Sequence, residues 1–269
     1  MTTISFVVPT KNAARTIAAC VRSLRQQTHP AIEIILVDNH SSDRTCALAA
    51  EYVDQVIVAG PERCAQRNIG AAAATGEVVV FVDADMVLEP GVAAEAALLI
   101  GAGELDALVL PEQAFGENFF AQCRSLEKRL YLGDPSVEAA RAIRRSLFDA
   151  VGGWDETHTA GEDWDLSDRL RAAGCRMGRT SAQVWHDEGT VRLFQQFKKK
   201  RYYGRWVAEF VARGGASGHL ARTSLVSQPR LLLAEPAKTA GLVALKAVEA
   251  SGLLTGMVGA RLHSRSAAA

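Results

Sequence analysis

A chain of 269 residues with 48% hydrophobic composition is long enough to bury a substantial core in one domain with a small appendage. Thirty basic residues balance thirty acidic ones, which argues against nucleic-acid binding driven by overall charge. The five cysteines are odd in number and include no CxxC pair, so we expect reduced thiols in a cytoplasmic protein and neither a disulfide framework nor a zinc site.

The first half of the chain predicts a largely parallel α/β sheet. Short apolar runs alternate with helical patterns, and strands buried on both faces have this continuous apolar character. The first run lacks a basic segment and a small-residue cleavage site, so we expect a strand there and not a secretory signal. The five runs are 4–8, 32–37, 56–59, 78–82 and 107–110.

Helices are expected between these runs. Apolar residues recur at helical spacing over 17–24, and a second helix is expected to begin after a cap at one of residues 41–43 and to run through Tyr52. Pro90 stands where the first turn of another helix would begin. The predicted order is therefore βαβαβαβ.

After about residue 111 the regular alternation fades. The pair Gly152-Gly153 predicts a tight turn, and Leu166 and Leu170 mark one face of a helix that Gly174 would end. A further strand is expected over 182–185. From about residue 192 onward the chain has a helical pattern, first basic and aromatic, later apolar and rich in alanine.

Two carboxylates stand at the end of a buried strand, at Asp83 and Asp85. The carboxyl ends of parallel strands line the ligand crevice of open α/β sheets. Two carboxylates about 4 Å apart repel by about 1 kcal/mol even in water. A divalent cation, Mn²⁺ or Mg²⁺, with open positions for phosphate oxygens would compensate them. The alternative is an acidic turn that is solvated and inert.

Other polar residues follow the neighbouring strands. Asp38 ends the second strand, where it could accept hydrogen bonds from a nucleobase or ribose, or cap the next helix. Residues 9–12 follow the first strand in the same way. Arg67, on the helix before the acidic strand, could pair with a diphosphate or with Asp83, or lie on a solvated helix face.

In this order, the segments resemble the family 2 glycosyltransferases of the GT-A fold, an α/β fold with a Rossmann-like, mostly parallel sheet flanked by helices. The resemblance spans residues 4–190. It rests on Val7-Val8-Pro9-Thr10-x-Asn12, Val37-Asp38-x-x-Ser41-x-Asp43, Arg67-Asn68-x-Gly70, Phe81-Val82-Asp83-Ala84-Asp85, Gly152-Gly153-Trp154-Asp155-Glu156 and Gly161-Glu162-Asp163-Trp164-Asp165-Leu166.

The resemblance implies a metal-dependent enzyme that moves a sugar from a nucleotide-diphosphate sugar to an acceptor hydroxyl with inversion, using Mn²⁺ or Mg²⁺. It places the catalytic domain at 1–190, with a donor half at 1–111 and an acceptor half at 112–190, followed by a helical extension at 191–269. The implied donor-binding residues are Pro9, Thr10, Asn12, Asp38, Arg67, Asp83, Ala84 and Asp85.

The resemblance also assigns the chemistry. Asp85 is the implied metal ligand, Asp83 a further candidate, and His186 either a third ligand or a structural residue. Asp163 is the implied catalytic base. Its spacing from the apolar positions of its helix points the carboxylate above the buried face, and a helix N-terminus favours the ionised form that a base needs. The implied acceptor contacts are Trp154, Glu162 and Asp165, of which Asp165 has an equal structural alternative.

The C-terminal extension suggests a membrane-proximal acceptor. Segment 198–206 joins a basic run to aromatic residues, which suits an anionic membrane surface or a lipid-carrier phosphate, or else a solvated basic helix with inward aromatics. Segment 241–262 contains Lys246 and Glu249, which makes a poor membrane span. We expect an amphipathic helix on a partner subunit or on the inner face of the membrane, and a cytoplasmic or peripheral protein with a lipid-linked acceptor or one from secondary metabolism.

Three rival functions are weaker. A sugar-phosphate nucleotidyltransferase usually has a glycine-rich loop after the first strand, and residues 9–13 lack one. A dehydrogenase is disfavoured because G-x-G-x-x-G is absent. A noncatalytic nucleotide-sugar-binding module is the main alternative, and the presence of both Asp85 and Asp163 argues against it.

Overall fold

The computed structural model describes residues 1–135, 137–157, 161–212 and 228–266, with the backbone alone described at 205–212 and 260–266. The chain forms two compact units. Residues 1–113 and 138–187 make the first, and residues 114–137 and 188–269 make the second. The predicted domain limits differ from these units mainly because residues 114–137 group with the C-terminal helices.

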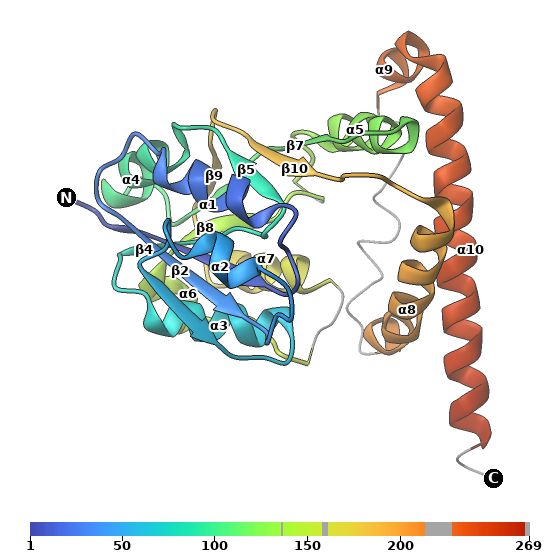
Figure 1. Cartoon of the computed structure of the whole chain (residues 1–269), viewed down its shortest axis with the longest axis horizontal. Coiled ribbons are helices and arrows are strands. Elements are labelled where there is room, and N and C mark those ends of the chain that lie inside the picture. Colours follow the sequence, from blue (N-terminus) through green and yellow to red (C-terminus); the bar gives the residue numbers. More distant parts are fainter. Residues whose placement is uncertain (136, 158–160, 213–227, 267–269) are drawn as a thin grey trace. The chain divides into compact units, whose positions relative to one another are not determined.

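A seven-stranded sheet in the order β3-β2-β1-β4-β8-β6-β9 forms the centre of the first unit (Figure 1). The strands β1, β2, β3 and β4 are parallel, as the alternating apolar runs predict. The strand β8 is antiparallel to both β4 and β6, and the sequence pattern did not predict it. The bounds are β1 Ile4–Thr10, β2 Ile32–Asp38, β3 Gln55–Val58, β4 Val78–Phe81, β6 Ala107–Val109, β8 Ala140–Arg144 and β9 Met177–Arg179.

A second, three-stranded sheet has the order β5-β10-β7. Its strands are β5 Met86–Leu88, β10 Val184–Asp187 and β7 Glu112–Phe115. The predicted strand 182–185 therefore begins two residues later and includes His186. Antiparallel pairing places His186 opposite Met86, directly after the acidic pair. This register carries a histidine distant in sequence to the end of β4.

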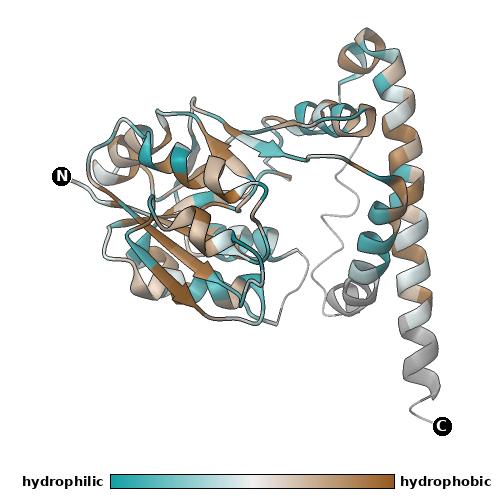
Figure 2. Cartoon of the chain, in the orientation of Figure 1, coloured by the Kyte–Doolittle hydropathy of each residue, from teal (hydrophilic) through white to brown (hydrophobic). Residues whose placement is uncertain are grey.

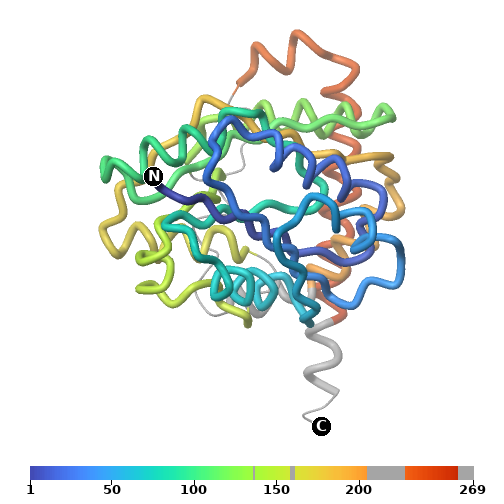
Figure 3. The backbone as a smooth tube through the Cα atoms, turned by 60° about the vertical axis from the view of Figure 1, so that its left-hand side comes forward, coloured from blue at the N-terminus to red at the C-terminus, as the bar shows by residue number. Residues whose placement is uncertain are grey.

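Helices cover both faces of the central sheet, several of whose strands are mainly brown, and so hydrophobic, in Figure 2. Alternate residues of a strand point to opposite faces, so Phe6 packs with α1 and α4 while Val7 packs with α3, α6 and α7. The chain can be followed through these layers from blue to yellow in Figure 3. The bounds are α1 Ile17–Arg25, α2 Thr45–Ala49, α3 Arg63–Ala73, α4 Val92–Gly101, α6 Arg145–Ala150 and α7 Glu162–Ala172.

The second predicted helix is shorter than expected. It begins at Thr45 and ends at Ala49, before Tyr52. The Asp43 carboxylate accepts hydrogen bonds from both the backbone N–H and the hydroxyl of Thr45. It also accepts the backbone N–H of Ala14. Asp43 therefore fixes the loop before the helix, a structural role.

The second unit is helical, as the C-terminal pattern predicts. It contains α5 Phe119–Tyr131, α8 Leu193–Ala212, α9 Pro229–Ala234 and α10 Pro236–Ser266. Its cores join Cys123, Leu126 and Leu130 to Leu242, and Ala121 and Val191 to Leu245. One stretch of α10, Pro236–Gly259, is long and apolar enough to cross a membrane by length and composition alone.

Candidate active site

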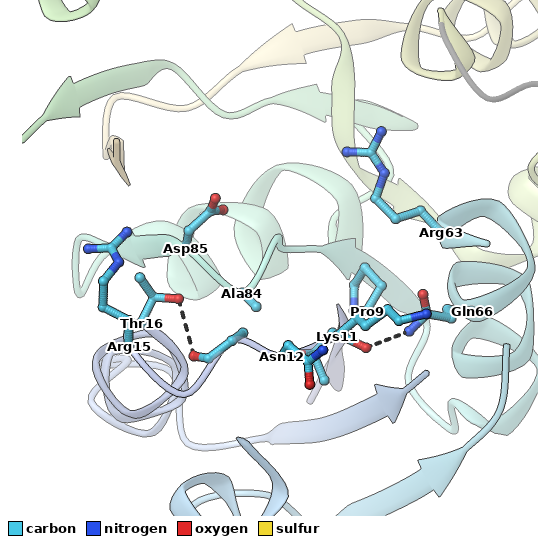
Figure 4. A pocket seen from close by; sticks show the side chains of 11 residues that line it. Pro9, Lys11, Asn12, Arg15, Thr16, Arg63, Gln66, Ala84 and Asp85 are labelled. Atoms are coloured by element: carbon cyan, nitrogen blue, oxygen red, sulfur yellow. Dashed lines mark hydrogen bonds between the residues drawn. The ribbon is translucent and has the colours of Figure 1, made fainter. Parts of the chain in front are cut away.

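A cavity of about 380 Å³ opens at the carboxyl ends of β1 and β4 in the first unit. Its polar lining includes three cationic side chains, of Lys11, Arg15 and Arg63, and one carboxylate, of Asp85. Figure 4 shows Arg15 and Asp85 on one side and Arg63 on the other. The predicted donor residues that line it are Pro9, Thr10, Asn12, Ala84 and Asp85. This lining suits a ligand with several negative charges.

The loops around the cavity are held by side-chain hydrogen bonds. Asn12 has a positive φ of 51°, and its side chain accepts the backbone N–H of Ser42. Asp38 is buried, and its carboxylate accepts both the N–H and the hydroxyl of Ser41, at 2.8 and 2.5 Å. Asp38 does not line the cavity itself. In this structure Asp38 stabilises the turn next to the cavity, and its contact with the nucleobase of a donor stays a prediction.

Arg67 lies at the centre of the site, with 0% of its surface exposed. One terminal nitrogen is 2.8 Å from Asp83 and the other is 3.4 Å from Asp163. Its guanidinium carbon is 4.4 Å from the ring centroid of Trp154, a cation–π contact. The carboxylates of Asp83 and Asp163, distant in sequence, therefore meet on one guanidinium.

Asp83 is neutralised twice. Its second carboxylate oxygen is 3.5 Å from Arg141, which also pairs with Glu112 at 2.7 Å. Burial alone would raise the pKa of Asp83, but the charges of Arg67 and Arg141 outweigh it and hold that pKa well below its usual range. Arg141 was not predicted, because its strand has no apolar run that would mark it.

Asp163 lies in the first turn of α7 with its side chain 36% exposed. Both the N-terminal end of the helix dipole and the nearby Arg67 attract a carboxylate. Its neighbour Glu162 is buried and pairs with Arg63 at 2.9 Å. Burial and the charge of Asp163 raise the pKa of Glu162 against the opposing charges of Arg63 and Arg67. Arg63 thereby connects the cavity lining to the α7 carboxylates.

Asp85 and His186 form the candidate metal centre. The imidazole Nε2 lies 3.1 Å from an Asp85 carboxylate oxygen. One oxygen and one nitrogen donor at the cavity edge suit Mn²⁺ or Mg²⁺ with water and phosphate oxygens as further ligands. Among the residues that the structure describes, no group of three or more His, Cys, Asp or Glu side chains could hold a metal. Asp83, held by two arginines, does not join this pair.

Trp154 and Asp165 have interior contacts that differ from the predicted acceptor contacts. Trp154 is 3% exposed and packs edge-on against Phe81. Asp165 accepts two hydrogen bonds from Arg169, at 2.9 and 2.7 Å. That guanidinium also donates to the carbonyls of Val151 and Gly153 at the predicted tight turn. Both residues therefore stabilise the surroundings of Asp163.

Asn68 anchors the same turn to α3. Its amide exchanges two 2.9 Å hydrogen bonds with the backbone of Trp154. Gly153 has a φ of 67°, and a Cβ there would lie 2.8 Å from the Asn68 amide oxygen. Glycine is therefore required at 153 by both conformation and space. This contact joins two segments, Arg67-Asn68 and Gly152-Gly153-Trp154, that the sequence placed in one site.

The sheet order, the cavity at its carboxyl edge and the acidic pair beside it define the class of the first unit, a GT-A type α/β domain. The chain belongs to glycosyltransferase family 2, which it matches over residues 5–153. It is 31% identical over 234 residues to the pre-mycofactocin glycosyltransferase of Mycobacterium tuberculosis, covering 78% of this chain. The chain spans about half of that relative, 48% of its length.

Two solved structures share the fold. One is TarS 1–349 of S. aureus in complex with UDP-GlcNAc, with a TM-score of 0.54 and 19% identity, covering 98% of this chain and 92% of that one. The other is the mannosyltransferase PcManGT of Pyrobaculum calidifontis in complex with GDP-Man and Mn²⁺. Its TM-score is 0.57 at 19% identity, covering 96% of this chain and 80% of that one.

Proposed function

We propose that the chain is a metal-dependent, inverting glycosyltransferase that uses a nucleotide-diphosphate sugar. The observation that carries the proposal is the meeting of Asp83 and Asp163 on Arg67, near a cavity that is lined by cationic side chains and by Asp85, the partner of His186. The two similar structures were solved with nucleotide sugars, one of them with Mn²⁺. Both complexes agree with a donor of this class.

In this proposal, the cavity holds the donor. The diphosphate pairs with the cations of the lining, Lys11, Arg15 and Arg63. The short side chains of Pro9, Thr10 and Ala84 let the donor approach the protein backbone closely. Asn12 and Asp38 hold the loops near the nucleoside. Arg67 orients the carboxylates of Asp83 and Asp163 beside the sugar. Asp85 and His186 hold Mn²⁺ or Mg²⁺, which when bound offsets the negative charge that develops on the diphosphate leaving group.

Asp163 acts as general base. Its carboxylate takes the proton of the incoming acceptor hydroxyl, whose oxygen attacks the anomeric carbon from the face opposite the diphosphate. The bond to the diphosphate oxygen breaks as the new glycosidic bond forms, so configuration inverts. Glu162 and Asp165 flank the base on α7. We propose Glu162 as an acceptor contact. Trp154 and Asp165 stabilise the structure around Asp163.

For the acceptor, we propose a lipid-linked or membrane-proximal alcohol, brought near by peripheral membrane contact through segments 198–206 and 241–262 on the inner face of the membrane. The support lies in the exposed cations Lys198, Lys199 and Arg201 on α8. Arg205 and Trp206, the last residues of the first segment, have side chains outside the described residues.

The test separates base chemistry from donor binding. Asp163→Asn keeps a polar side chain of the same size and removes the proton acceptor. We expect it to retain the thermal stabilisation that a matching nucleotide sugar with Mn²⁺ produces, and to lose at least about 100-fold in transfer rate. The measurement is nucleoside diphosphate release with a mixture of acceptors, with and without Mn²⁺.

Asp168→Asn is the matched control. Asp168 lies on the same helix, exposed and paired with Arg171, and its amide variant should transfer at the rate of the unmodified protein. Full transfer by Asp163→Asn would remove Asp163 as the base. Donor stabilisation without any metal-dependent release, in the unmodified protein, would favour the noncatalytic nucleotide-sugar-binding module instead.

A further inference from the structure

The second unit contains a helix whose polarity is inverted. In a water-soluble bundle the apolar side chains of a helix face its neighbours and the charged ones face solvent. In α10, the buried Glu249 and the half-buried Lys246 face the other helices. Over Pro236–Gly259, a fully described stretch of 24 residues, every exposed side chain is uncharged. In Figure 2, α10 is mainly white and brown.

Two charged residues of α10, Lys246 and Glu249, form a closed ring of ion pairs with α5, while Lys238 in the first turn pairs with Glu235. Arg124 pairs with Glu127 at 2.7 Å and also with Glu249. Lys246 pairs with Glu249 at 3.1 Å and also with Glu127. Each cation therefore contacts both anions. Ionisable groups next to lipid have this arrangement, in which they face the protein interior and pair with one another.

The few polar groups on the exposed face of α10 are satisfied within the helix. Its exposed hydroxyls are those of Ser251 and Thr255. The first donates a 2.8 Å hydrogen bond to the carbonyl of Val248 and the second a 2.7 Å bond to the carbonyl of Ser251. Neither needs water as a partner. The remaining exposed side chains are alanines and aliphatic residues, among them Val243, Leu254 and Val258.

The neighbouring helix α8 places cations beside this uncharged face. Glycines bring α8 and α10 into close contact, because a Cβ at Gly256 would lie 2.2 Å from the carbonyl oxygen of Arg201. Arg201 and Lys198, both exposed on α8, therefore lie beside the second half of the apolar stretch. If α10 crossed the bilayer, these cations would lie at the depth of the hydrocarbon, which is strongly unfavourable.

We infer that α10 lies in the plane of an anionic membrane, with its uncharged face among the acyl chains and the cations of α8 at the headgroups. Lys198 lies 4.6 Å from the ring centroid of the exposed Phe194, the mixture of cation and aromatic ring that suits an interface. A second copy of the chain would oppose these cations with identical ones, whereas anionic headgroups complement them. This inference rests on the membrane contact proposed above and not on the donor chemistry.

The test is sedimentation of the full chain with vesicles of phosphatidylglycerol and phosphatidylcholine, compared with phosphatidylcholine alone. We expect binding to the anionic vesicles at low salt, weakened by salt. Leu254→Glu should lower the partition by about tenfold or more, because it places a charge on the lipid-facing surface. Leu98→Glu is the matched control, since Leu98 is 67% exposed and Leu254 62% exposed. Leu98 lies on α4 in the first unit, and its variant should bind as the unmodified chain does.

Four further measurements distinguish the ways in which the inference could fail. Lys198→Gln with Lys199→Gln should weaken binding by roughly fivefold for each lysine removed. If that double variant loses binding while Leu254→Glu keeps it, the basic helix binds alone and the α10 face does not insert. Alkaline carbonate should release the bound protein, and resistance to it would show a crossing helix. Self-association without vesicle binding would identify a second copy as the occupant. Donor-induced stabilisation of Leu254→Glu reports the first unit separately.

Discussion

Arg67 determines how the two aspartates of the acidic pair differ. A guanidinium with 0% exposure is stable only with partners, and here they are Asp83, Asp163 and the ring of Trp154. Asp83 is thus committed to the protein interior, with Arg141 on its other oxygen. Asp85, two residues after Asp83, lines the cavity and contacts His186. The same residue type therefore has two environments, one between buried arginines and one at the cavity.

This division predicts different outcomes for two matched variants. Asp85→Asn removes the charge of the proposed metal ligand, so we expect Mn²⁺ affinity in the presence of nucleoside diphosphate to fall by at least about tenfold. Asp83→Asn should leave that affinity nearly unchanged. It should lower the free energy of unfolding by about 3 kcal/mol, because a buried arginine loses its partner. Calorimetric Mn²⁺ titration and urea unfolding measure the two effects. Equal loss of Mn²⁺ affinity in both variants would show that Asp83 is a ligand too.

The sequence indicated the acids of the site and one cation, Arg67, whose pairing with Asp83 was among its predicted roles, but it did not indicate the other cations. Asp85 and His186 each end or follow an apolar run, a position that marks the ligand edge of a sheet. Arg15 and Arg63 have no such mark, and only the folded loops bring both to the cavity. Arg141 depends on a strand that the pattern did not predict. Long cationic side chains can reach a site from many positions, so their sequence spacing carries little information.

Elements were predictable where burial is two-sided. The parallel strands β1, β2 and β4 are largely apolar and buried because helices cover both faces of the sheet, whereas β3 is an exposed edge strand that its short apolar run still predicted. The strand Ala140–Arg144 alternates small or apolar residues with arginines, and pairing with β4 and β6 determines its conformation. The helix after Asp43 was predicted to run through Tyr52, but it has only five residues and ends at Ala49. Hydrogen bonds from Thr45 to the Asp43 carboxylate set its start. Pairing with distant strands decided the first case, and side-chain hydrogen bonds of Asp43 decided where the helix begins in the second.

Close packing of α8 on α10 depends on three glycines. A Cβ at Gly204 would lie 2.3 Å from the carbonyl oxygen of Leu253, and one at Gly252 would lie 2.6 Å from that of Phe197. Together with Gly256 they let two helix backbones approach within van der Waals distance. The G-x-x-x-G spacing alone is too common to predict this contact. Here it joins two helices of one chain.

Gly256→Ala should therefore destabilise the second unit. The added methyl group would meet backbone of α8 at 2.2 Å, which cannot yield as a flexible side chain does, so we expect a loss of about 1 to 3 kcal/mol. Gly259→Ala is the control on the same helix, because nothing lies within 4 Å of its Cβ position. It should be neutral or stabilise by up to about 1 kcal/mol through helix propensity. Thermal unfolding followed by circular dichroism measures both, and a neutral Gly256→Ala would contradict the packing described.

In the whole molecule the net charge is zero, but charged residues are arranged differently in the two units. In the first unit, arginines hold the acids around a ligand cavity. In the second, a ring of four charges is enclosed by helices while the outer face of α10 is uncharged. Each unit has hydrophobic clusters of its own. Changes in one set of charges should therefore alter the stability of the unit that contains it.

The charge ring gives the second unit a defined response to acid. Burial would raise the pKa of Glu249, but Arg124 and Lys246 outweigh it and lower the pKa from 4.5 to about 2. A depressed carboxylate pKa stabilises the fold fully above the unfolded value, and that stabilisation is lost as pH falls from about 4.5 toward 2. Glu249→Gln should therefore cost about 3 kcal/mol at pH 7 and roughly half of that at pH 3.

Differential scanning calorimetry of the full chain across this pH range measures the effect of Glu249→Gln. Glu235→Gln is the comparison, since Glu235 lies between α9 and α10. Glu235 also pairs with two cations, Arg129 and Lys238, but its side chain is 22% exposed against 4% for Glu249. Water screens such a pair, so its loss should cost about 1 kcal/mol or less. If the two variants were equally destabilised, or if the cost of Glu249→Gln did not shrink in acid, enclosure of the ring by the helices could not be the source of its stabilising effect.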